Sequence, residues 1–140
     1  MALTAAVREF LVQLEELLDA KSWPGLDRTR ATPATGGDTA RVVLAPKASG
    51  PVDPVALQID DRAVVVTYGP EHDEFTSRDE ALQFIEMLGD GRVELEIARN
   101  VAWTTMRSYR DGQTIPFRRT RMPWPTLRPR VERRRFGFTD

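Results

Sequence analysis

Three carboxylates and the only imidazole of the chain stand side by side in Glu71-His72-Asp73-Glu74. Such a group could bind a divalent cation, because imidazole nitrogens and carboxylate oxygens are common metal ligands. Metal sites usually draw their ligands from several elements, and four adjacent loop residues cannot all converge on one ion. We therefore interpret this run as a solvated acidic loop ahead of a helix, and we predict no metal site and no cofactor.

The sequence contains no recognisable catalytic signature. A serine hydrolase would need His72 as its base, but no Gly-x-Ser-x-Gly turn is present. Asp60 or Asp61 with Glu94 or Glu96 could form a pair of glycosidase type, but a turn and an exposed strand face already explain these positions. Glycine-rich phosphate loops are missing as well. We therefore expect a protein that is not an enzyme.

Charge is unevenly divided along the chain. Residues 1–98 contain 9 Arg or Lys against 18 Asp or Glu, whereas residues 99–140 contain 11 Arg against 3 Asp or Glu. The net charge of −1 therefore hides two opposed halves. These halves must either pair with each other or present a charged surface to a partner.

Two binding hypotheses follow from this division. The preferred one is a protein partner that contacts either the basic C-terminal surface or an acidic surface formed by Glu71, Asp73, Glu74, Glu94 and Glu96. The alternative is a polyanion or nucleic acid, because guanidinium groups bind phosphates and aromatic rings stack on bases. Its candidate residues are Arg118, Arg119, Arg121, Arg133, Arg134, Arg135 and Trp124. The same arginines could instead neutralise the acidic part of the chain, and the sequence leaves this choice open.

Two helices are predicted. Apolar residues at helical spacing from Leu3 to Leu18 indicate an amphipathic helix over residues 4–21. Ser77 and Glu80 have the spacing of a capping box, which starts a second helix over residues 78–88. Gly89 is expected to end that helix in the left-handed conformation.

Alternating apolar residues predict strands at 41–45, 55–59, 63–68, 92–98, 101–109 and 113–118. Residues 131–138 form either a last edge strand or a loose tail, and the sequence leaves this choice open. Asp60-Asp61 and Asp111-Gly112 are expected to form hairpin turns. Residues 27–38 are interpreted as a loop. Pro116 cannot donate to a strand ladder, so its strand should lie at a sheet edge.

This order of elements predicts an α+β fold. We expect one antiparallel, twisted sheet of five to seven strands with both helices on one face, in the order α-β-β-β-α-β-β-(β). Residues 1–140 should form a single domain, and the proline- and arginine-rich segment 120–140 should pack on it. Its apolar residues are Trp124, Leu127, Val131, Phe136 and Phe138.

A cytoplasmic location is expected, because the chain has no cysteine, no signal-peptide pattern and no apolar run that could cross a membrane. Small α+β layouts of this kind are similar to those of toxin-neutralising immunity proteins and secretion chaperones. The sequence therefore predicts a small, non-enzymatic protein-binding domain with an immunity-protein-like or chaperone-like accessory role and no membrane partner.

Overall fold

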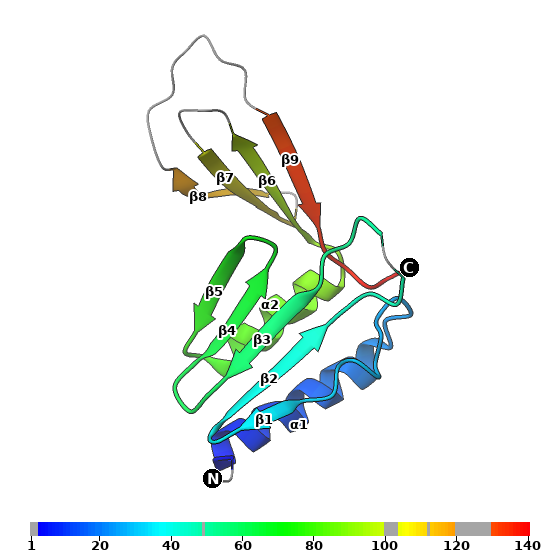
Figure 1. Cartoon of the computed structure of the whole chain (residues 1–140), viewed down its shortest axis with the longest axis vertical. Coiled ribbons are helices and arrows are strands. Elements are labelled where there is room, and N and C mark those ends of the chain that lie inside the picture. The colour runs from blue at the N-terminus through cyan, green and yellow to red at the C-terminus, as the bar shows by residue number, and fades with distance from the viewer. Residues whose placement is uncertain (1–2, 49, 100–103, 112, 120–129) are drawn as a thin grey trace.

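The computed structural model of the chain describes residues 3–48, 50–99, 104–111, 113–119 and 130–140, with only the backbone described at 104–105 and 113–119. These residues form an α+β fold with antiparallel sheets, as predicted (Figure 1). The elements are α1 (Ala5–Lys21), β1 (Ala34–Gly36), β2 (Thr39–Leu44), β3 (Val55–Ile59), β4 (Val64–Tyr68), β5 (Glu71–Phe75), α2 (Arg78–Gly89), β6 (Val93–Arg99), β7 (Thr104–Arg110), β8 (Gln113–Arg119) and β9 (Arg130–Arg135).

The strands lie in two sheets, whereas a single sheet was predicted. Strands β1 to β5 form a five-stranded sheet in sequence order, which we call the meander sheet. The second, or C-terminal, sheet has the order β8-β7-β6-β9. β6 pairs with β7 on one side and β9 on the other, so neither of its edges remains for the meander sheet. The helix α2 between β5 and β6 separates the two sheets along the chain (Figure 1).

Two of the strands, β1 and β5, occupy segments that were predicted as loops. Gly37, with φ of 62°, turns β1 back onto β2, and Gly69, with φ of 60°, turns β4 back into β5. Both glycines have a conformation that other residues adopt only at a cost. Neither strand carries an apolar alternation, so composition alone indicated loops, but backbone pairing with a neighbouring strand is sufficient to form them.

Both helices begin close to the predicted residues. The Ser77 side chain accepts a hydrogen bond from the amide of Glu80, as predicted, and the Thr4 side chain caps α1 in the same way by accepting one from the amide of Val7. The prediction for the end of α2 was wrong, because Gly89 is still helical and Gly91, with φ of 75°, is the left-handed residue.

Gly89 is required for another reason. A Cβ atom at this position would lie 2.1 Å from the ring of Trp23. Trp23 also donates a hydrogen bond from Nε1 to the Asp90 carboxylate, at 2.9 Å. The close approach of the Trp23 ring to the end of α2 therefore depends on the absence of a side chain at Gly89.

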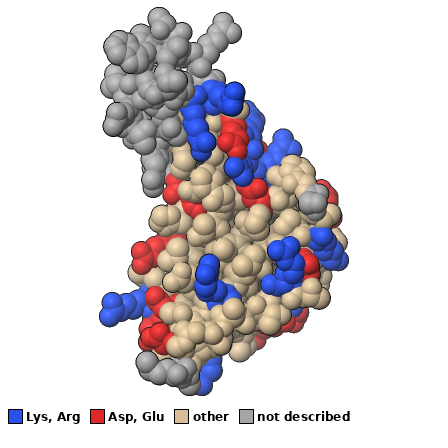
Figure 2. Space-filling model, in the orientation of Figure 1, with Lys and Arg blue, Asp and Glu red and all other residues tan. Residues whose placement is uncertain are grey.

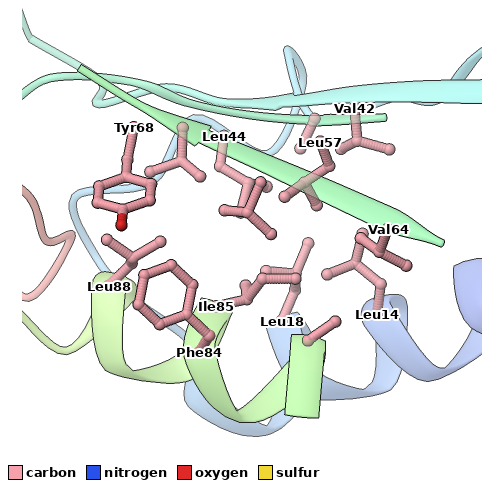
Figure 3. Close-up of a cluster of buried hydrophobic side chains, with 14 of the residues drawn as sticks. Leu14, Leu18, Val42, Leu44, Leu57, Val64, Tyr68, Phe84, Ile85 and Leu88 are labelled. Atoms are coloured by element: carbon pink, nitrogen blue, oxygen red, sulfur yellow. The ribbon is translucent and has the colours of Figure 1, made fainter. Parts of the chain in front are cut away.

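The helices cover one face of the meander sheet. Alternate residues of β2, β3 and β4 are buried, and the remaining residues of these strands are exposed or half-buried. Figure 3 shows side chains of both helices pointing toward this buried face. The labelled residues are Leu14, Leu18, Phe84, Ile85 and Leu88 from the helices, and Val42, Leu44, Leu57, Val64 and Tyr68 from the strands.

Residues at the end of the described chain complete the same core. Phe136 and Phe138 are buried, and the rings of Phe138 and Trp23 have centroids 5.9 Å apart. The Phe138 amide donates to the carbonyl of Gly89, and the Phe138 carbonyl accepts from Gly25, each at 2.8 Å. Val131 is 53% exposed. The predicted packing of residues 120–129, including Trp124, concerns positions outside the described residues.

The predictions of the Asp60-Asp61 turn and of the sheet edge are confirmed, whereas Gly112 of the second predicted turn lies outside the described residues. The Asp60 carboxylate accepts hydrogen bonds from the amides of Arg62 and Ala63 in the hairpin between β3 and β4. β8, which contains Pro116, lies at the edge of its sheet. Neither helix in the described part of the chain combines the length and the apolar character needed to cross a bilayer.

Candidate functional site

The predicted acidic surface does not form as one surface. Glu71 is only 4% exposed, Asp73 is half-buried and Glu74 is exposed, because all three lie in strand β5 and not in a solvated loop. Alternation along the strand turns Glu71 and Asp73 inward and His72 and Glu74 outward. Within the described residues, no group of three or more His, Asp or Glu side chains is arranged to hold a metal ion.

Asp73 instead belongs to a polar network between the two sheets. The Tyr68 hydroxyl donates to Asp73 Oδ2 at 2.7 Å, and Arg110 Nη2 donates to the same oxygen at 2.9 Å. The Arg110 guanidinium lies 4.6 Å from the ring centroid of Phe84 and also bonds to Ser108, which is buried. Burial and the Asp73 carboxylate raise the pKa of Tyr68 far above its usual range. The phenol therefore stays protonated and acts as a structural donor.

Glu94 and Glu96 lie on a different surface, the outer face of the C-terminal sheet. Glu96 stands opposite Arg107 of β7 and Arg133 of β9, and Glu94 stands opposite Arg135. Arg133 reaches Glu94 at 3.5 Å and Glu96 at 3.4 Å. We call these five residues the charge ladder. Residues of the predicted acidic surface and of the predicted basic surface therefore lie side by side here and pair with each other.

The remaining predicted arginines have different positions. Arg134 lies on the opposite face of β9 from the charge ladder, 3.1 Å from the Asp53 carboxylate, and it also pairs with Glu132. The hydrogen bond with Asp53 raises the pKa of Arg134 above its already high value. Arg118 and Arg119 lie in β8, where only the backbone is described. Arg121 and Trp124 lie outside the described residues.

A furrow between α1 and α2 was not predicted from the sequence. Two hollows of about 370 and 460 Å³ share Gln13 and Asp79 among their lining residues, so they adjoin along the two helices. Leu17 and Leu82, both partly buried, line the second hollow. We call this surface the interhelical furrow.

The interhelical furrow is predominantly acidic. Its charged lining residues are Glu9, Glu16, Asp60, Asp61, Asp79, Glu86, Arg62 and Arg78. Some of the carboxylates are already engaged, since Glu9 pairs with Arg78 and Glu86 with Lys21. Glu16 and Asp79 are exposed and have no cationic partner within the described residues. Two carboxylates therefore remain available beside an apolar strip.

One buried polar atom also faces no partner in this region. The side-chain oxygen of Gln13 is shielded from solvent and accepts no hydrogen bond from the described residues. A buried acceptor without a donor costs roughly 1–3 kcal/mol.

Sequence reasoning missed the furrow because each helix was considered separately. The signal was present in the pattern of α1, where Gln13, Glu16 and Leu17 lie within four residues and so share one side of a helix. However, the packing of α2 beside this side of α1 depends on the tertiary structure, which the pattern of one helix does not show.

Comparisons with protein-family models, with curated proteins and with solved structures gave no match to this chain. The function is therefore argued from the geometry alone.

Proposed function

We propose that this chain is a protein-binding domain, without a catalytic role of its own, that holds a basic segment of its partner in the interhelical furrow. The main support is the pair of uncompensated carboxylates, Glu16 and Asp79, beside the apolar strip formed by Leu17 and Leu82. A partner segment with Lys or Arg beside apolar side chains would complement both features. In biological terms the proposal corresponds to an immunity-protein-like or chaperone-like accessory role.

The state of the other acidic residues supports the same choice of surface. Asp73, Glu94 and Glu96 already pair with arginines of the same chain. A partner would have to break these contacts in order to use them. Glu16 and Asp79 have no cationic partner within the described residues, so a partner binds them without such an exchange.

A defined basic peptide tests the proposal. The probe is a synthetic amphipathic helix with Leu on one face and Lys on the other, and the same helix with Glu in place of Lys serves as the comparison. We expect the Lys peptide to bind and the double variant Glu16→Gln/Asp79→Asn to weaken that binding about tenfold or more, because both charges face the bound segment. Isothermal titration calorimetry measures both affinities.

The matched control removes the same charge elsewhere. Asp38 and Glu74 are exposed and have no cationic partner within the described residues, so Asp38→Asn/Glu74→Gln should leave the affinity nearly unchanged. Equal weakening by the two double variants would show a general charge effect and contradict a furrow site. So would equal binding of the Lys and Glu peptides.

A further inference from the structure

Two arginines stand directly opposite each other where β6 pairs with β9. The register places Arg99 of β6 across from Arg130 of β9, and both side chains are exposed. Side chains directly opposite across a strand pair are about 5 Å apart at Cβ, and like charges in that arrangement are destabilising. The charge ladder, further along β6 and on its other face, has the opposite arrangement, because each of its rows places a glutamate beside an arginine. The Arg99–Arg130 row therefore differs from the charge ladder in placing two like charges opposite each other.

The chain does not supply a counter-charge for this row. All 21 Asp and Glu residues belong to the described part of the chain, and none pairs with Arg99 or Arg130 within 4.0 Å. The nearest carboxylate along β9, that of Glu132, already pairs with Arg134. Both guanidinium groups are therefore open to an anionic group of another molecule.

Further arginines lie close by in the same sheet. Met106 pairs with both Ile97 of β6 and Arg118 of β8, and Thr105 pairs with both Ala98 and Arg119. In the backbone pairing, Arg119 thus lies one row and Arg118 two rows from the Arg99–Arg130 row. We call Arg99 and Arg130 the basic tip. Figure 2 shows Lys and Arg side chains gathered in this part of the molecule, beside β9.

We propose that the basic tip binds the phosphate backbone of a single-stranded nucleic acid, with Arg99 and Arg130 as its central contacts. Guanidinium groups bind phosphate oxygens through paired hydrogen bonds. A protein partner would also require an apolar centre, and Val131 is the only large apolar side chain of the C-terminal sheet that is exposed within its described residues. A phosphate chain requires charge alone. This site is independent of the interhelical furrow.

The experiment measures fluorescence anisotropy of a labelled single-stranded oligonucleotide with the full chain. We expect binding at low salt and a loss of about tenfold or more in the variant Arg99→Gln/Arg130→Gln. The slope of log affinity against log salt should also become shallower by about 1.4, since each neutralised phosphate contributes about 0.7 for single strands. Arg30→Gln/Arg41→Gln removes the same charge from exposed arginines of other elements and should change the affinity less than about twofold.

Three results would overturn the proposal. The first is no binding by the natural sequence at low salt. The second is equal weakening by the two double variants, which would show that overall charge and not the tip decides binding. The third is equally tight binding of poly-glutamate of matched charge, which would assign the tip to an acidic protein. We expect the melting temperature of Arg99→Gln/Arg130→Gln not to fall, because the substitution removes a pair of like charges. An unchanged or higher melting temperature shows that a loss of binding in this variant does not come from unfolding.

Discussion

The meander sheet with its two helices and the C-terminal sheet differ in the charged residues that surround their buried apolar faces. The first region is an apolar layer closed by helices that carry seven acidic and three basic residues. The second contains nine arginines and three glutamates in four strands. One face of its central strand is apolar, whereas the other face is lined by the charge ladder.

The comparison shows where in the molecule the acidic and basic residues without partners of opposite charge lie. Glutamates of β6 lie opposite Arg107, Arg133 and Arg135, but three glutamates balance only part of the nine arginines in this sheet. Carboxylates without a cationic partner therefore remain in the interhelical furrow, and arginines remain in excess on the C-terminal sheet, including its basic tip. The charge asymmetry of the sequence is therefore concentrated at two separate surfaces.

The largest expected effect comes from removing the ring that joins the two regions. Phe138→Ala should lower the free energy of unfolding by about 4 kcal/mol, because a buried phenylalanine is replaced by a cavity beside Trp23. Urea unfolding followed by both tryptophan fluorescence and far-UV circular dichroism measures it. Thr139→Ala, at the exposed neighbour, is the control. Two separate transitions in the natural sequence would instead show that the sheets unfold independently.

A smaller effect is expected at the polar network between the sheets. Arg110→Ala should cost about 2 kcal/mol, because Asp73 and Tyr68 lose their cationic partner in a half-buried position. Arg107→Ala, in the same strand but exposed, should stay within about 0.5 kcal/mol. Thermal and urea denaturation of both variants check the difference. Similar losses in the two variants would mean that the network does not join the sheets.

The smallest effect is expected in the charge ladder. Arg133→Ala should cost less than about 1 kcal/mol, since its side chain is 60% exposed and its pairs with Glu94 and Glu96 are screened by water. High salt should remove even this difference. Urea titrations at low and high salt measure it, with Arg135→Ala as the comparison. A cost of several kcal/mol would show that the charge ladder stabilises the sheet as strongly as its apolar face does.

Local signals predicted much of the fold. The Ser77 cap, the Asp60 turn and the edge position of Pro116 each depend on the chemistry of a few neighbouring residues, and all three are confirmed. The division into two sheets could not be predicted this way. It depends on which strands pair over long separations, such as β6 with β9, and no local pattern encodes that choice.

The binding residues were harder to predict for the same reason. Glu71 and Asp73 were expected at the surface because charged residues in a run are usually solvated, but the inward side of β5 offers Tyr68 and Arg110 as partners for Asp73. Glu94 and Glu96 were placed correctly on the polar side of a strand. Their pairing with Arg133 required the position of β9, which the sequence left as one of two alternatives.

The contact between Trp23 and Phe138 also affects how the chain can fold. Trp23 directly follows α1 and Phe138 follows β9, so most of the chain lies between the two rings. Closing so long a loop costs conformational entropy before the contact between the rings can form. Folds rich in such distant contacts form slowly. α1 and α2 both precede Phe136 and Phe138 in the chain, so during synthesis their shared core stays incomplete until these two residues have emerged. We therefore expect slow folding.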